Sequence, residues 1–175
     1  MDSNALARFE AAVLPHMDAA YTLARYLTRN AHDAEDVVQD ACLRALKYFD
    51  TFRGAEGASA RAWLLAIVRN TAYSWRGRRR MDGAATEFDE TQHSDAVADE
   101  HPDGAVLRSD AKETLHRALE RLAPEFREVI VLRELEGMSY KEISDVAGVP
   151  VGTVMSRLSR ARARLQETLR EAEGR

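Results

Sequence analysis

The sequence predicts an all-α protein made of two small helical domains joined by a flexible acidic linker. Alanine, leucine, arginine and glutamate, which favour helices, are abundant. Glycine and proline, which interrupt helices, number only 9 and 4 in a chain of 175 residues. No run of alternating Val, Ile and Thr bounded by turn residues is present to build a sheet.

The distribution of charge predicts the linker. Residues 1–81 contain 12 Lys/Arg and 9 Asp/Glu, and residues 108–175 contain 13 and 12. Residues 82–107 contain 8 acidic residues, no Lys or Arg, and no apolar residues at helical spacing. We therefore expect domains at 1–81 and 108–175 and a linker at 82–107. The net charge of −4 arises in the linker, so it does not exclude a nucleic-acid partner.

In the N-terminal domain, apolar residues recur every three or four positions, which is the spacing of a buried helical face. Asp33 is expected to cap a helix, and Gly54 and Gly57 to break the chain before a helix from about Ser59 to Arg76. The residues expected to face the core are Leu6, Phe9, Val13, Leu14, Ala20, Leu23, Ala24, Leu27, Ala34, Val37, Val38, Ala41, Ala45 and Leu46.

The C-terminal domain is predicted to open with a helix that stops near Pro124 and a second that ends at Gly137. Ser139 and Glu142 then have the spacing of a capping box, so a helix should begin there. Gly148 suits a left-handed turn, and Pro150 restarts the chain into a helix from Val151 to about Leu169. Two short helices joined by a tight turn form a helix-turn-helix, whose second helix enters the DNA major groove.

At about 100° per residue, the second helix of this unit has an apolar and a polar side. The apolar side, expected to face the core, holds Val151, Val154, Leu158, Ala161 and Leu165. Small residues on the other side would let the helix approach DNA closely, and arginines could read guanine edges or bind phosphates. The exposed length is predicted to be basic because it carries Arg157, Arg160, Arg162 and Arg164.

Two surfaces of the N-terminal domain lie outside its predicted core. Asp36, Gln39 and Asp40 are expected to form an acidic, hydrogen-bonding patch that suits a basic partner helix, or alternatively a helix face that serves only solubility. An aromatic, an amide and a hydroxyl gather on the helix from Ser59, which suits unstacked bases, although the aromatic, Trp63, could equally belong to the core. A basic cluster suited to phosphates, or alternatively a solvated helix end, follows at Arg76, Arg78, Arg79 and Arg80.

Several motifs resemble those of bacterial sigma factors. The stretches 132–143, 150–154, 156–158 and 160–162 resemble sigma region 4. Residues 33–40 resemble region 2.2, and residues 52–54, 62–64 and 69–72 resemble regions 2.3 and 2.4. The order and spacing are similar to those of the extracytoplasmic-function (ECF) subfamily, which has only these two domains.

The resemblance implies a transcription initiation factor, not an enzyme, with no cofactor or metal. It implies that Asp36, Gln39 and Asp40 bind the β′ clamp helices of core RNA polymerase, with the β flap as a further contact. It implies contacts to the −10 non-template strand from Arg53, Arg61, Trp63, Asn70, Ser74, Arg76, Arg78 and Arg79, with a flipped base near the 53–61 loop. The −35 duplex would be read by Val151, Gly152, Thr153, Met155, Ser156, Arg157 and Arg160.

The resemblance also leaves questions open. Met155 and Ala66 stand where many relatives carry longer, often basic side chains, so the promoter sequence is not predicted. The acidic linker is hypothesised to thread into the polymerase's template and RNA-exit path, mimicking phosphates. Factors of this kind are commonly held inactive by an anti-sigma protein. Cys42 is a weak candidate for a redox sensor because its alanine neighbours suggest packing.

No signal peptide or membrane-spanning run is found in the sequence, so we expect a cytoplasmic protein with no membrane partner, monomeric when free. A stand-alone helix-turn-helix regulator is the main alternative, but it would not need the acidic 33–40 helix or Trp63 and Asn70. An enzyme is disfavoured because the histidines are scattered and no nucleophile–base pair or phosphate-binding glycine loop occurs.

Overall fold

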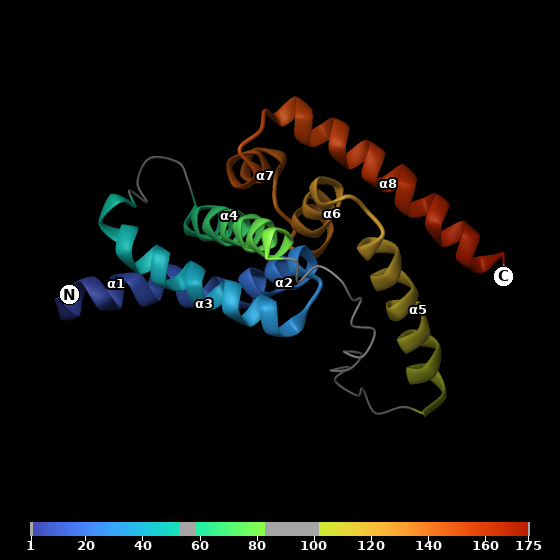
Figure 1. Cartoon of the computed structure of the whole chain (residues 1–175), viewed down its shortest axis with the longest axis horizontal. Helices are drawn as coiled ribbons and strands as arrows, with labels where there is room; N and C mark the ends of the chain where they lie inside the picture. Colours follow the sequence, from blue (N-terminus) through green and yellow to red (C-terminus); the bar gives the residue numbers. More distant parts are fainter. Residues whose placement is uncertain (1, 53–58, 83–101, 175) are drawn as a thin grey trace.

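The structure is a computed structural model that describes residues 2–52, 59–82 and 102–174 (Figure 1). Most of these residues lie in helices. Side chains of α5 are described from Arg108 onward. The elements are α1 (Ser3–Val13), η1 (Leu14–His16), α2 (Met17–Thr28), α3 (Ala31–Tyr48), η2 (Phe49–Thr51), α4 (Ala60–Met81), α5 (Pro102–Glu120), α6 (Pro124–Ile130), η3 (Val131–Leu135), α7 (Tyr140–Ala147) and α8 (Val151–Glu173). No strand occurs in these stretches, so the all-α prediction is confirmed.

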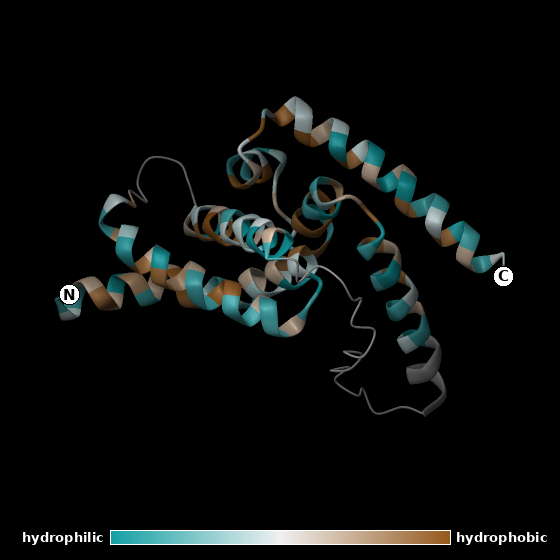
Figure 2. Cartoon of the chain, in the orientation of Figure 1, coloured by the Kyte–Doolittle hydropathy of each residue, from teal (hydrophilic) through white to brown (hydrophobic). Residues whose placement is uncertain are grey.

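In the N-terminal half, α2, α3 and α4 pack against one another, and α1 lies against α4. Their inward residues are the aliphatic side chains that the helical spacing predicted, and hydrophobic residues gather where these helices meet (Figure 2). Burying one such leucine stabilises the fold by about 2 kcal/mol. The fully buried set includes Ala20, Leu23, Ala24, Ala34, Val37, Ala41, Ala45, Leu64, Leu65 and Val68.

The C-terminal half is held together by α8, which packs against α5, α6 and α7. Val154, Leu158 and Ala161 of α8 are buried, whereas hydrophilic residues prevail further along the helix (Figure 2). Between α6 and α7 the chain makes a π-helical turn, η3, in which the Glu136 amide donates to the Val131 carbonyl at 3.1 Å. The turn ends at Gly137, whose φ of 62° suits a residue without Cβ.

The two halves are in contact through several helices. In Figure 1, α4 lies between the remainder of the N-terminal half and α7, and the contacts between α4 and α7 and between α2 and α6 agree with this view. One hydrophobic cluster runs through both halves. The helix α5 begins at Pro102, earlier than the boundary at residue 108 expected from the charge pattern. Residues 83–101 of the predicted linker lie outside the described residues.

Some predictions of burial and capping are wrong. Asn30, not Asp33, caps α3: its side chain accepts a hydrogen bond from the Asp33 amide at 3.0 Å. Asp33 is instead buried and paired with Arg79 at 2.9 Å. Leu6 and Leu14 are 45% and 62% exposed, because α1 is an outer helix and η1 turns the chain at Leu14. The helix predicted for 59–76 continues to Met81.

No helix in the described ranges has the length and apolar character to cross a membrane.

Candidate nucleic-acid interface

The turn between α7 and α8 is built from local hydrogen bonds. The predicted capping box is present: the Glu142 amide donates to Ser139 Oγ at 3.1 Å, and the Ser139 amide donates to Glu142 Oε1 at 3.3 Å. Gly148 ends α7 with a φ of 67°, as predicted. The Ser144 hydroxyl then donates to the Val149 carbonyl at 2.5 Å, which ties the turn to α7. These contacts fix the direction in which α8 leaves the turn.

The N-terminal part of α8 presents a mixed face to solvent. Gly152, Ser156 and Arg160 are exposed, and Thr153 and Arg157 are half-buried. Val151 and Met155 are 40% and 54% exposed, so the prediction that Val151 faces the core is wrong. Val151 is the first helical residue, one turn before the core contacts begin at Val154. Apolar, small and basic groups therefore share this surface, which suits base edges, methyl groups and phosphates.

Nothing in the fold of the described residues explains the glycine at position 152. A Cβ built on Gly152 would meet no heavy atom within 4 Å, and its backbone is ordinary helix. A glycine inside a helix costs about 0.5–1 kcal/mol relative to alanine. The open space beside Gly152 would accommodate close approach of another molecule to the α8 backbone.

The later arginines of α8 bind within the protein. Arg162 donates to Glu134 at 2.7 Å and 3.2 Å, and the Arg164 guanidinium lies 5.3 Å from the centroid of the Phe126 ring. Both side chains are exposed, so the exposed length of α8 is basic as predicted, although η3 and α6 engage these two cations. Arg160 on the exposed face precedes them.

The helix α4 carries most of the residues assigned to the −10 surface, and these differ in their surroundings. Asn70 and Ser74 are exposed, and the Asn70 side-chain oxygen accepts from Arg69 at 3.3 Å. Burial, followed by the nearby charge of Arg80, lowers the pKa of Arg76. Arg78 lies 5.3 Å above the Trp75 ring. Arg53 lies outside the described residues, as does most of the 53–61 loop.

Trp63 belongs to an aromatic cluster at the start of α4. Its ring centroid lies 4.7 Å from that of Phe52 and 6.2 Å from that of Phe49, and its side chain is half-buried. Both interpretations left open by the sequence therefore have support: one part of the ring packs on the protein and another faces solvent.

The outer face of α3 combines acidic and apolar groups. Asp36 and Gln39 are exposed, while Asp40 is half-buried and pairs with Arg44 at 3.2 Å. Leu43, one turn further along the same face, is 64% exposed. The sequence prediction identified only the polar part of this surface, although the spacing from Gln39 to Leu43 would have placed the leucine beside it.

On the side of α4 that faces the C-terminal half, donor side chains form hydrogen bonds with acceptors of that half. Arg61 donates to the Glu136 carbonyl at 3.1 Å and to Glu142 Oε2 at 3.0 Å. Arg69 donates to Glu128 Oε1 at 2.6 Å, and the Tyr73 hydroxyl donates to the other oxygen of Glu128 at 3.3 Å. Arg61 thus contacts α7 and the segment before it, and Arg69 and Tyr73 contact α6.

The two carboxylates in these contacts differ in burial, and their pKa values are shifted in opposite directions. Glu128 is fully buried, and burial raises the pKa of its carboxyl even though Arg69 opposes the change. Burial and then the charge of Glu128 raise the pKa of Tyr73 to about 12. The Glu142 carboxyl is closer to solvent. Burial is the largest single influence on it and raises its pKa, but the hydrogen bonds from Arg61 and Ser139 and the charge of Arg61 together lower the pKa below its ordinary value. Ionisation therefore favours the contact at Glu142 more than the contact at Glu128.

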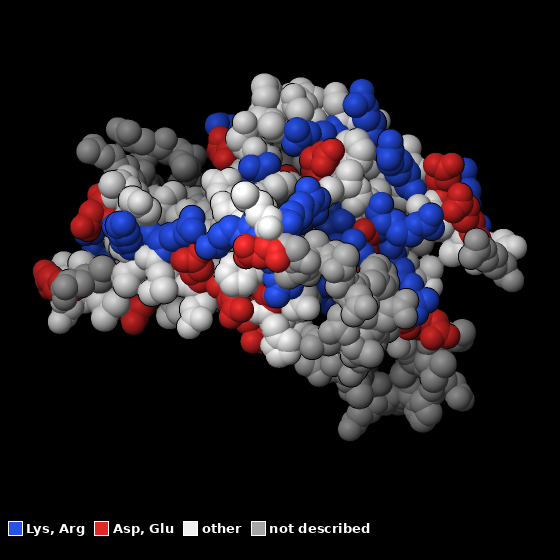
Figure 3. All heavy atoms as spheres, viewed as in Figure 1, with Lys and Arg blue, Asp and Glu red and all other residues white. Residues whose placement is uncertain are grey.

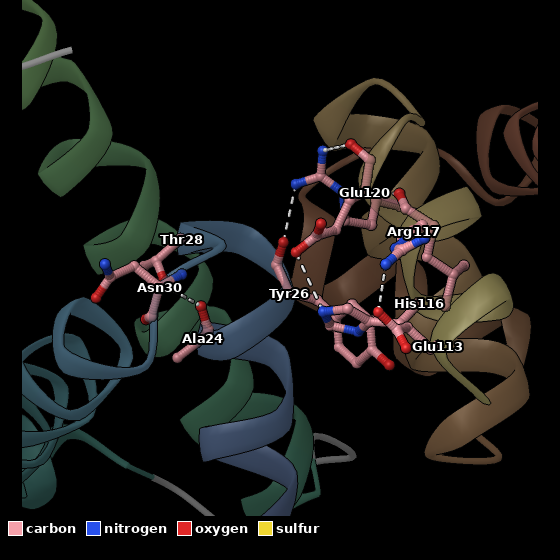
Figure 4. A network of polar contacts seen from close by, with 10 residues as sticks. Ala24, Tyr26, Thr28, Asn30, Glu113, His116, Arg117 and Glu120 are labelled. Carbon is pink, nitrogen blue, oxygen red and sulfur yellow. Dashed lines mark hydrogen bonds and ion pairs between the residues drawn. The ribbon is translucent and has the colours of Figure 1, made fainter. Parts of the chain in front are cut away.

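A second polar region joins the halves near the end of α2. Buried Arg127 donates to the carbonyls of Leu119, Glu120 and Leu122 at 3.0, 3.1 and 2.8 Å, and to that of Tyr26 across the interface at 2.8 Å. Figure 4 shows Tyr26 of α2 facing α5, where its ring lies 5.3 Å from that of His116. Burial lowers the pKa of Arg127 to about 10.

Basic side chains form a broken band across the middle of the face shown in Figure 3, extending toward α5 and α8. The band crosses the junction of the two halves, so a polyanion on this face would meet both.

Comparison with known proteins identifies the family. Residues 12–81 match the model of Sigma-70 region 2, and residues 112–165 match that of Sigma-70, region 4. The chain is 38% identical over 176 residues to the RNA polymerase sigma-H factor of Pseudomonas aeruginosa, covering 94% of this chain and 89% of that protein. It is 37% identical over 136 residues to the ECF RNA polymerase sigma-E factor of Escherichia coli, covering 74% and 70%.

The chain belongs to the ECF sigma factors. It therefore acts in promoter-specific transcription initiation with RNA polymerase, and sigma factors are regulatory initiation factors.

Solved structures of sigma factors have the same fold. A sigma factor RpoE from Bartonella quintana, solved with the anti-sigma factor NepR, aligns with a TM-score of 0.75 and 31% identity, covering 93% of this chain and 97% of that one. CnrH, solved with the cytosolic domain of CnrY, aligns with a TM-score of 0.66 and 29% identity, covering 93% and 88%. The predicted division into sigma domains 2 and 4 agrees with the family matches.

The sequence missed the groups that join the two sigma domains. Glu128 and Arg127 were not singled out, and Arg69 was seen only as part of a motif. The sequence does carry a signal of this buried pair: Arg127 and Glu128 stand directly before the apolar run at 129–132, which is buried in the structure. Charges at the edge of an apolar run are rarely buried unless they are paired.

Proposed function

We propose that this sigma factor reads the −35 duplex with the exposed N-terminal face of α8 and the −10 non-template strand with α4. The open space beside Gly152 on an exposed, mixed-polarity helix face is the observation that carries the proposal. In a helix-turn-helix this face is the one that enters the major groove.

For the −35 element, the contributing residues share one side of the first turns of α8. Gly152 and Ser156 allow the backbone to come close, and Thr153 and Arg157 flank them. Arg160 is placed for a guanine edge or a phosphate, and Val151 and Met155 offer apolar contacts to thymine methyl groups. The amide groups at the start of α8 have no side-chain cap and favour a phosphate there.

For the −10 element, the exposed Asn70 and Ser74 suit hydrogen bonds to an extruded base, and Trp63 and Phe52 offer aromatic surface. Arg61, Arg76, Arg78 and Arg79, together with Arg53, supply charge along the strand. Arg79 pairs with Asp33 and Arg61 with Glu142, so both would have to exchange a carboxylate for a phosphate.

The outer face of α3 is proposed as the polymerase-binding surface. Asp36, Gln39 and Asp40 would orient a basic helix of the β′ clamp, and the exposed Leu43 would supply apolar contact. The C-terminal domain would contact the β flap. An anti-sigma partner is also proposed, because a similar sigma factor was solved with one.

Run-off transcription with purified core polymerase on a promoter library tests the proposal. The wild-type chain should favour a small set of start sites that share sequences near −35 and −10. A gel shift without polymerase is the companion measurement: tight binding to a duplex operator by the chain alone, with no start-site preference when polymerase is present, would favour a stand-alone regulator instead.

A further inference from the structure

A single ridge of α4 makes the side-chain hydrogen bonds from this helix to the C-terminal domain. Arg61, Arg69 and Tyr73 lie at multiples of four residues along the helix, and Leu65 fills the gap in the buried core beneath. The Arg69 guanidinium also lies 4.4 Å from the centroid of the Tyr73 ring. The ridge thus presents two guanidinium groups and a phenol in one line.

The groups bound to this ridge are anionic or carbonyl oxygens. Glu142 and the Glu136 carbonyl bind Arg61, and the two oxygens of Glu128 bind Arg69 and Tyr73. A carboxylate offers a guanidinium the same planar pair of acceptors as a phosphate does. An arginine stacked on an aromatic ring beside further donors is also a common platform for single-stranded nucleic acid.

With its two domains in contact, the chain cannot bind both promoter elements at once. We call this arrangement of the domains closed. Elements centred at −35 and −10 lie about 25 base pairs apart, which is about 85 Å of duplex at about 3.4 Å per pair. In the structure α4 packs directly on α7, which leads into α8, and α8 with its 23 residues is only about 35 Å long. The domains must therefore separate when both elements are bound.

We propose that the Arg61–Arg69–Tyr73 ridge of α4 is a nucleic-acid-binding surface that the C-terminal domain covers in the free chain, with Glu128 and Glu142 in place of phosphates. Closure and strand binding then exclude each other. This inference rests on the proposed function and adds Arg69 and Tyr73 to the strand-binding groups.

The test opens the interface without touching the ridge. Glu128→Lys places a cation against Arg69, and Glu142→Gln removes the charge that pairs with Arg61 while a glutamine can keep the capping box. The matched control is Glu134→Lys, which makes the same change of charge at an exposed ion pair with Arg162 inside the C-terminal domain.

Two readouts are needed on the full chain: the radius of gyration by small-angle scattering, and the affinity for a fluorescent single-stranded oligodeoxynucleotide. Glu128→Lys should expand the chain and tighten oligonucleotide binding about fivefold or more, the lower end of coupling between linked sites. Glu142→Gln should act in the same direction more weakly, and Glu134→Lys should change neither beyond its effect on nonspecific charge. Adding Arg69→Ala and Tyr73→Ala to the Glu128→Lys chain should abolish the increase in oligonucleotide affinity.

Expansion without tighter binding would show that the ridge does not bind nucleic acid. An unchanged radius for both Glu128→Lys and Glu142→Gln would show that these carboxylates do not hold the domains together. Circular dichroism checks folding, and Glu142→Gln, at a half-buried position, remains informative if Glu128→Lys is unstable. Run-off transcription by the wild-type chain distinguishes these failures from a failure of the proposed function, because it depends on neither variant.

Discussion

The helices α4 and α8 are both long and rich in arginine, yet their arginines have different partners. On α8 the residues proposed to read DNA lie on an exposed face, and the engaged cations Arg162 and Arg164 come later. On α4, Arg61, Arg69 and Arg79 are each paired with a carboxylate. A cluster of arginines therefore indicates binding capacity, but its partner in the free protein depends on the tertiary structure.

The largest effect is expected from filling the open space on α8. Gly152→Leu should leave the melting temperature unchanged or higher, because the space is empty and glycine weakens a helix. Promoter-specific run-off transcription should fall about 100-fold, a loss of about 2.7 kcal/mol in DNA binding. The control is Ala163→Leu, at an exposed position further along α8. Full activity of Gly152→Leu would mean that DNA does not approach this backbone.

Replacing an exposed arginine of α8 should affect DNA and not stability. Arg160→Ala is expected to weaken binding of the holoenzyme to −35 duplex by about 1–3 kcal/mol while the free energy of unfolding stays the same. A base contact would relax specificity at one position. A phosphate contact would instead reduce the salt dependence of binding uniformly across sequences. If neither changes, Arg160 does not reach DNA.

Replacing a paired arginine of α4 should, in addition, lower the stability of the fold. Arg79→Ala leaves the buried carboxylate of Asp33 without this partner, so chemical denaturation should show a loss of about 1 kcal/mol, discounted because Arg79 is half exposed. Arg78→Ala is the matched control, because it removes the neighbouring exposed arginine, which contacts the Trp75 ring and not Asp33. Equal stability of the two variants would contradict a structural role for the Arg79–Asp33 pair.

The smallest effect concerns pH. The carboxyl of Glu128 has a raised pKa in the closed chain, so protonation favours closure, and the closed fraction should rise as the pH falls from 7 toward 4.5. Glu142, whose pKa is lowered, loses its contribution only below its ordinary value of 4.5. Energy transfer between dyes on the two domains would measure closure. Glu128→Gln should remain closed and lack this part of the pH response; an identical response in both chains would exclude Glu128 as its source.

The sequence predicted what local rules determine. The helices, the capping box at Ser139 and the left-handed Gly148 follow from residues a few positions apart, and the structure contains them. The predicted cap of α3 was wrong because Asn30 and Asp33 are both good caps, and in the structure Asn30 caps the helix while Asp33 pairs with Arg79. The partners of Arg61 and Arg69 lie on another domain, 81 and 59 residues away, and no local pattern specifies them.

The π-helical turn at Val131–Leu135 has a consequence for evolution of the promoter-reading unit. One surplus residue there rotates everything downstream by about 100° relative to a continuous α-helix. Loss of that single residue would shift the entry of the chain into the helix-turn-helix relative to α6, without altering any side chain proposed to face DNA. The length of this turn is therefore one determinant of how the helix-turn-helix sits on α6, beside the hydrogen bonds of the α7–α8 turn and the packing of α8 itself.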